Sequence, residues 1–336
     1  MSAPEQVRAI ADAVLYEGYI LWPYRRSALK NQRRFTFGGV YPPAHSREHE
    51  DDPSTMRTEM LLECGEAAGI DVMVRFLQVV ERSVARRFDD RFEPVDELTI
   101  AGERHMSWEE AVEREIRASG LSVDALAHGL RVPISIRAGS QREQLLDERG
   151  RAVGALTRSW RALDGEVRIS CERESGALAR ILVEVLNSTS FGGGSRQRAL
   201  TLTFCSTHAL LHARGGSFVS LTDPPEALRG AAKACRNEGA WPVLVGEPGT
   251  RTTMLCSPII LEDHPRIAPE SPGDLFDGGE IDQLLILNIL SLTDEEKAEM
   301  RATDPRAREI LERTEALTPE ELMRLHGTIR EFGMER

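Results

Sequence analysis

The sequence has no apolar run long enough to cross a membrane, and only 5% of its 336 residues are aromatic. A membrane-spanning helix needs about 18 consecutive apolar residues, and the longest apolar run, 284–290, is interrupted by Asn288. The first residues also lack the basic and then apolar order of a signal peptide. We therefore expect a cytoplasmic protein without a membrane span.

The motifs of several common enzyme classes are also missing. The sequence contains no G-x-S-x-G, G-x-G-x-x-G or H-E-x-x-H, which are the patterns of a hydrolase nucleophile turn, a dinucleotide-binding loop and a zinc-protease helix. The five cysteines are scattered without a C-x-x-C pair, so we expect reduced, mostly buried thiols rather than disulfides or zinc ligands. These absences favour a protein that is not an enzyme and that needs no cofactor.

Charge is distributed unevenly along the chain. Acidic residues outnumber basic ones, 54 to 42, which gives a net charge of -12. Because nucleic-acid binding depends on basic surface, this balance argues against a general nucleic-acid partner. Residues 261–336 contain 19 acidic and 9 basic residues, whereas residues 16–41 contain five basic residues and one acidic residue.

Alternating, β-branched segments separated by turn residues dominate the middle of the chain and predict an antiparallel sheet. The predicted fold class is α+β, with a central antiparallel β-sandwich-like domain, an N-terminal aromatic segment and a C-terminal helical region. Three regions are expected: an N-terminal α+β region over 1–130, an antiparallel β domain over 131–260 and an acidic helical region over 261–336.

Local patterns predict particular elements. Residues 58–82 resemble two strands separated around Gly65–Gly69. Ser107 and Glu110 have the spacing of a capping box and predict a helix to about residue 118. Thr293 and Glu296 form a second capping box, and Pro305 follows Asp304 at the favoured first position of a further helix.

The segment 16–41 combines aromatic and basic residues. It contains all four tyrosines of the chain together with five basic side chains. Such residues are enriched at protein interfaces, which predicts a partner-binding surface; the alternatives are a core filled by the rings with the arginines paired to the acidic C-terminal region, and stacking on single-stranded nucleic acid. The candidate partner-binding residues are Tyr19, Trp22, Tyr24, Arg25, Lys30 and Arg34.

Two groups of side chains are weak candidates for a metal site. His208 and His212 would share one face of a helix but would lie roughly 13 Å apart along a strand, where ordinary sheet side chains are the simpler interpretation. Asp274 and Asp277 follow a Ser-Pro-Gly turn and could bind a hard cation through oxygen, although Asp277 could equally cap a helix that starts near residue 280.

Three runs of sequence resemble an uncharacterised protein family encoded beside the structural and maturation genes of actinobacterial-type NiFe-hydrogenases. These runs are Tyr16–Asn31, Thr207–Pro225, and Ser257–Leu261 continued by Pro269–Asp277. The resemblance implies a role in the assembly, maturation or support of a large metalloenzyme, and it assigns no catalytic or metal-binding residue.

We therefore expect a non-catalytic accessory or scaffold protein whose partner is a NiFe-hydrogenase subunit or a maturation factor. The alternative is an enzyme of unrecognised type, such as a metal-dependent hydrolase that uses Asp274, Asp277, His264 or His208.

Overall fold

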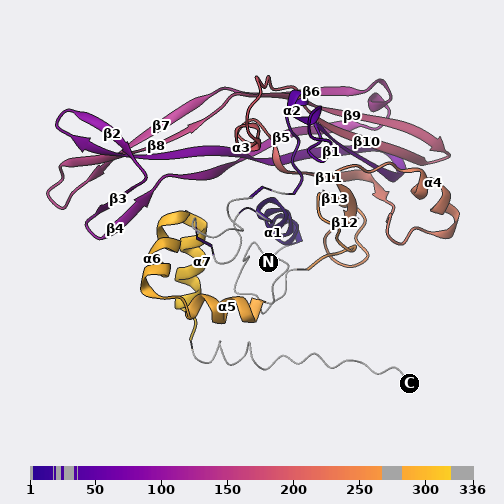
Figure 1. The fold of residues 1–336 in the computed structure, drawn as a ribbon. Helices are drawn as coiled ribbons and strands as arrows, with labels where there is room; N and C mark the ends of the chain where they lie inside the picture. The colour runs from indigo at the N-terminus through magenta and orange to yellow at the C-terminus, as the bar shows by residue number, and fades with distance from the viewer. Residues whose placement is uncertain are drawn as a thin grey trace.

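The computed structural model describes residues 3–17, 19, 24–25, 34–35, 37–266 and 282–318. Within these residues the fold is α+β, with one large antiparallel sheet and several helices (Figure 1). The strands are β1 (Thr55–Phe88), β2 (Arg91–Val95), β3 (Glu97–Ile100), β4 (Glu103–Met106), β5 (Trp108–Ser122), β6 (Leu130–Ile136), β7 (Gly139–Leu146), β8 (Ala152–Trp160), β9 (Leu163–Ser175), β10 (Leu178–Asn187), β11 (Cys205–Phe218), β12 (Trp241–Leu244) and β13 (Thr253–Ser257). The α-helices are α1 (Ala3–Tyr16), α2 (Pro43–Ser46), α3 (Arg196–Leu200), α4 (Arg229–Ala234), α5 (Asp282–Leu290), α6 (Asp294–Thr303) and α7 (Pro305–Glu315).

Eleven of the described strands join in a single sheet. Its main path runs β12-β13-β11-β1-β10-β9-β6, with β2, β5 and β8 paired to β1 and β7 paired to β8. The strands β3 and β4 form a separate hairpin. The predicted α+β class with an antiparallel sheet is confirmed, whereas a closed sandwich is not shown because the described strands of the large sheet form one hydrogen-bonded array.

Strand β1 organises this sheet because its 34 residues pair with five other strands. The prediction of two strands over 58–82 was wrong in one respect. The chain does not leave the sheet at Gly65–Gly69; the pairing with β11 shifts register between Cys64 and Gly69, where Ala67 has a positive φ of 52°. An irregularity of this kind bends a strand without ending it.

Both faces of β1 are buried in the middle of the sheet. Ile70, Val72, Val74 and Phe76 alternate along the strand and belong to the main core, which also takes side chains from β5, β6, β9, β10 and β11. Leu77 and Val79 belong to a second apolar cluster together with residues of α1, α3 and α5–α7. The β-branched and aromatic composition that predicted strands here suits burial of this kind.

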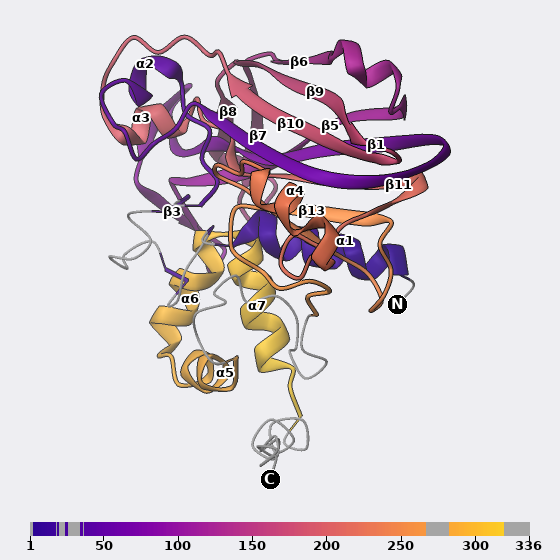
Figure 2. The same cartoon turned by 90° about the vertical axis from the view of Figure 1, so that its right-hand side faces the viewer.

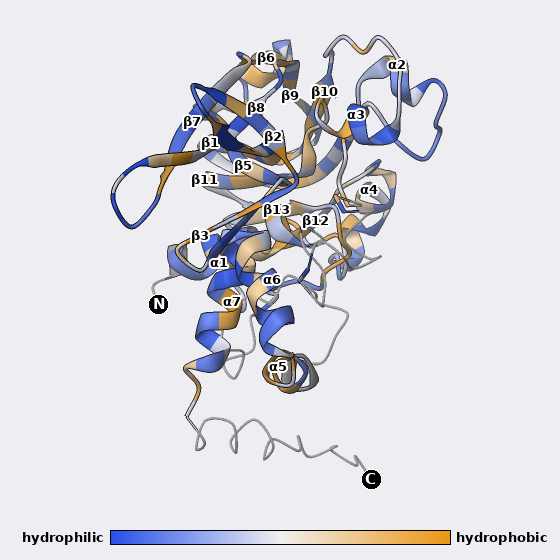
Figure 3. Ribbon diagram, turned by 60° about the vertical axis from the view of Figure 1, so that its left-hand side comes forward, coloured by the Kyte–Doolittle hydropathy of each residue, from blue (hydrophilic) through white to orange (hydrophobic). Residues whose placement is uncertain are grey.

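The helices α1 and α5–α7 lie on one side of the large sheet (Figures 1 and 2). Hydrophilic residues cover most of α6 and α7 (Figure 3), and their buried residues Met300, Ala307, Ile310 and Leu311 pack in the second cluster. The predicted N-terminal signals are confirmed: Thr293 and Glu296 form the capping box of α6, and Asp304 caps α7 with Pro305 in its first turn.

The helix predicted from Ser107 to about residue 118 was wrong, because this segment is β5. Its residues pair with β1 from Trp108↔Arg82 to Ser122↔Gly69. The Ser107 hydroxyl accepts a hydrogen bond from the backbone N–H of Val84 and donates one to the carbonyl of Val95. Pairing along a long strand therefore outweighs a local capping pattern.

No described helix is long and apolar enough to cross a membrane.

Candidate functional site

Four of the six predicted partner-binding residues lie in described parts of the chain, and three of these are buried. Tyr19, Tyr24 and Arg34 expose at most 4% of their surface, and both tyrosine rings belong to the second apolar cluster. Trp22 and Lys30 lie outside the described residues. Because a buried side chain does not face a partner, the structure gives the partner-binding prediction no support at these three positions.

The contacts of these residues agree with internal packing and pairing to the acidic C-terminal region. The Tyr19 hydroxyl donates a 2.6 Å hydrogen bond to Oδ2 of Asp304. Nη1 of Arg25 lies 2.9 Å from Oε1 of Glu296 in the first turn of α6. Burial and the adjacent Asp304 carboxylate raise the pKa of Tyr19, so its hydroxyl remains a hydrogen-bond donor.

The two predicted histidines lie four residues apart on β11 and have different surroundings. His208 is fully buried, with Nδ1 3.1 Å from the carbonyl of Ser206, and burial lowers its pKa to about 4. His212 is exposed, and its Nδ1 lies 3.2 Å from the hydroxyl of Thr253. Asp274 and Asp277 lie outside the described residues, and among those described no group of three or more metal-ligating side chains could hold an ion.

A polar network that sequence reasoning missed joins the sheet to the C-terminal helices. Nη2 of Arg82 donates to the carbonyl oxygens of Ala302 and Thr303 at 2.9 and 2.8 Å, which places its guanidinium at the C-terminal end of α6. Nη1 of Arg82 donates to Glu110 at 2.8 Å. Unsatisfied carbonyls end every helix, but no spacing in the sequence shows that an arginine more than 200 residues away would bind these ones.

Arg75 forms a second buried centre of this network beneath α1. Its side chain is 1% exposed, and Nη2 contacts Asp12 of α1 at 2.6 Å and Glu113 of β5 at 3.1 Å. Glu113 also accepts hydrogen bonds from the Tyr16 hydroxyl at 2.7 Å and from Arg306 of α7 at 3.0 Å. Buried Arg75 is therefore paired with partly exposed carboxylates, and these contacts link α1 and α7 to the sheet.

One end of the sheet projects from the rest of the molecule as a β arm, formed by residues 79–88 of β1 with β2, β7 and β8 and covered by the β3–β4 hairpin (Figure 1). A small core of Val84, Leu98, Leu145 and Leu156 holds the hairpin on the arm. The guanidinium of Arg142 on β7 lies 4.1 Å from the centre of the Phe92 ring on β2. This contact links the two outer strands of the arm, β2 and β7.

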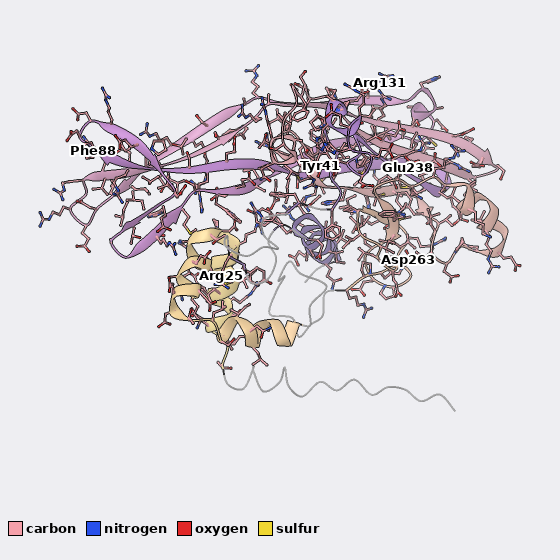
Figure 4. All side chains as sticks on the ribbon, viewed as in Figure 1. Arg25, Tyr41, Phe88, Arg131, Glu238 and Asp263 are labelled. Carbon is pink, nitrogen blue, oxygen red and sulfur yellow. The ribbon has the colours of Figure 1, made fainter. Side chains whose placement is uncertain are left out.

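The outer end of the β arm carries two exposed apolar side chains. Phe88 is 64% exposed and Leu146 is 52% exposed. The pairing of Phe88 with Arg91, of Arg86 with Gly154 and of Leu146 with Ala152 brings both to the same end of the four strands. Figure 4 shows Phe88 at this outer end of the β arm, far from Tyr41 and Glu238.

No protein-family model matches this chain, and no curated protein matches it.

Proposed function

We propose that this chain is a non-catalytic accessory protein that binds another protein through the outer end of its β arm. The observation that carries the proposal is the exposure of Phe88 and Leu146 together at this end. Phe88 lies on the same face of β1 as the buried Val84, four residues earlier, because side chains alternate along a strand. The exposed pair therefore continues the small core of the arm beyond the cover that β3 and β4 provide.

The chemistry of the arm end fits a protein partner. Exposed aromatic and aliphatic side chains that sit beside arginines are typical of interaction sites, and Arg86, Arg87 and Arg91 flank Phe88 in the same hairpin. Arg87 lies 3.5 Å from Asp90 in the same turn. We expect the partner to cover the two apolar side chains and to offer carboxylates to Arg86 and Arg91.

The partner that we propose is a NiFe-hydrogenase subunit or a maturation factor, in the cytoplasm. This part of the proposal is supported only by the resemblance of Tyr16–Asn31 and the two later runs to the hydrogenase-associated family. A metal-dependent hydrolase has no comparable support among the described residues, because His208 is buried and His212 contacts a threonine.

The test is affinity purification of the tagged full-length chain from hydrogenase-expressing cells, followed by mass spectrometry. We expect the unaltered chain to recover a hydrogenase subunit or maturation factor, and the double variant Phe88→Asp/Leu146→Asp to lose it. Ile260→Asp is the matched control, because Ile260 is 82% exposed but lies outside the β arm. Equal recovery with both variants would exclude the arm end as the binding surface, and recovery of no hydrogenase component would exclude the proposed partner.

A further inference from the structure

Arg34 is buried among aromatic rings beside the large sheet. Its guanidinium carbon lies 3.9 Å from the centre of the Trp108 ring, 4.9 Å from that of Phe35 and 5.5 Å from that of Tyr19. Only 4% of the residue is exposed. Rings of this kind stabilise a cation through their faces, and the Tyr19 side chain also favours the charged form of Arg34.

Among the described residues, the carboxylate that pairs with Arg34 lies beyond hydrogen-bond distance. Nη2 donates a 2.6 Å hydrogen bond to the backbone carbonyl of Glu109, whereas the Glu109 carboxylate lies 3.7 Å away and also accepts from Gln197. Burial lowers the pKa of Arg34, which reflects the cost of removing this charge from water. A buried guanidinium normally has an anionic oxygen in direct contact.

Two buried N–H groups at this stack have no hydrogen-bond partner in the described part of the chain. They are Nη1 of Arg34 and Nε1 of Trp108. Leaving a buried donor unpaired is costly, so two of them at one stack point to a missing acceptor.

Both side chains line a cavity of about 560 Å³. Phe35 and Leu200 contribute apolar surface to its wall, and Glu81 and Arg82 contribute charge. The volume is that of a small-molecule site. Two glutamates line the cavity beside the two arginines, so a ligand with a single negative charge suits the cavity better than a dianion, which the glutamates would repel more strongly.

We propose that this cavity binds a small organic carboxylate with a flat apolar body, whose carboxylate accepts hydrogen bonds from Arg34 and Trp108. A carboxylate has two acceptor oxygens, one for each unpaired donor, and its single negative charge adds to the pairing of Arg34 with Glu109. The apolar body packs against Phe35 and Leu200. This site is separate from the outer end of the β arm and does not depend on the proposed partner.

Benzoate is the probe for this site, and the indole N–H signals of the four tryptophans are the readout. In ¹⁵N-labelled full-length protein we expect benzoate to shift one indole signal saturably, with a Kd of about 1 mM. Trp108→Phe identifies that signal by removing it. Benzyl alcohol, which keeps the ring but lacks the charge, should shift it at least about tenfold more weakly, the ratio expected for one charge-assisted hydrogen bond.

Two variants, each of which removes one charge from the cavity lining, test the electrostatic contribution to benzoate binding. Arg34→Gln should weaken benzoate binding about tenfold or more. Because Arg34 is buried and its loss can unfold the chain, Glu81→Gln is the second variant: the Glu81 side chain is 47% exposed, and removing its charge should tighten benzoate binding a few-fold. Glu238→Gln, at an exposed position outside the cavity, should change nothing.

Three results would overturn the proposal. They are an unshifted Trp108 signal, equal shifts with benzoate and benzyl alcohol, and a Trp108 shift with inorganic phosphate but none with benzoate. Unchanged affinity in Glu81→Gln would likewise contradict the repulsion expected from the lining glutamates.

Discussion

The Tyr19 hydroxyl donates a 2.6 Å hydrogen bond to the Asp304 carboxylate across 285 positions of sequence. The other carboxylate oxygen of Asp304 accepts from the backbone N–H of Arg306 at 2.8 Å and thereby caps α7. One buried side chain therefore begins a helix and ties it to the N-terminal segment.

This double role predicts coupling between the two positions. Tyr19→Phe should lower the free energy of unfolding by about 1.5–3 kcal/mol, the contribution of a hydrogen bond to a charged group. Asp304→Ala should cost at least as much, because the cap is lost as well. Urea denaturation of both single variants and the double variant should give a coupling energy of about 0.5–3 kcal/mol; additive effects would show that the contact is not energetically significant.

The position of Arg82 at the end of α6 predicts that Arg82→Met and Arg158→Met lower the free energy of unfolding by unequal amounts. Arg82→Met should lower the free energy of unfolding by about 3 kcal/mol, because it leaves the carbonyls of Ala302 and Thr303 without their donor and removes a buried charge pair with Glu110. Arg158→Met is the control, since Arg158 contacts the same glutamate at 2.7 Å but is 31% exposed. Its loss should cost about 1 kcal/mol or less, and equal losses would contradict the role assigned to Arg82.

Burial of neutral His208 predicts that the protein loses stability in mild acid. Burial lowers its pKa from 6.5 in the unfolded chain to about 4, so the unfolded state binds the proton first as the pH falls. Above pH 6.5 His208 is neutral in both states and does not change the free energy of unfolding. Between pH 6.5 and 4 its protonation in the unfolded chain lowers the free energy of unfolding, by about 3 kcal/mol in all.

The measurement is the free energy of unfolding between pH 7 and 4. His208→Asn should flatten the pH dependence over this interval, whatever its effect at neutral pH. The exposed His212→Asn should leave the slope unchanged. An identical slope in the chain with and without His208 would assign the acid lability to other groups.

The structure of the β arm predicts that substitutions of two residues on one face of β1 change the free energy of unfolding by different amounts. Val84→Ala should lower the free energy of unfolding by about 1–3 kcal/mol, because Val84 is 1% exposed in the core of the arm and its methyl groups are removed from a packed site. Phe88→Ser should change it by about 0.5 kcal/mol or less, since the ring is largely exposed. Calorimetry of both variants tests this, and a large loss for Phe88→Ser would indicate that the ring supports the fold rather than a partner.

Local patterns predicted the parts of the fold that local chemistry determines. The caps of α6 and α7 depend on residues three positions apart or fewer, and the β-branched alternation in β1 specifies a strand wherever its partners lie. The pattern at Ser107 was misleading because its outcome depends on pairing between β5 and β1, which no short window of sequence contains.

The two candidate sites depend on contacts between residues that are distant in sequence, which local patterns do not specify. The arm end depends on the register that brings Phe88 and Leu146 together, and the cavity depends on Arg34 meeting Trp108 from 74 positions away. The sequence did indicate that Arg34 is unusual, through the aromatic and basic composition of its segment. It could not show that the rings would enclose the guanidinium instead of leaving it on the surface.

The placement of β1 also has a consequence during synthesis on the ribosome. The strand is complete at Phe88, but its neighbours β10 and β11 end at Asn187 and Phe218. At roughly 5–20 residues per second, translation leaves this apolar strand without those neighbours for on the order of ten seconds. The hairpins within 84–106 need no later segment, whereas the arm is complete only after β8 ends at Trp160. The edges of β1 that pair with β10 and β11 are the last to be covered, and we expect chaperones to bind the nascent chain in that interval.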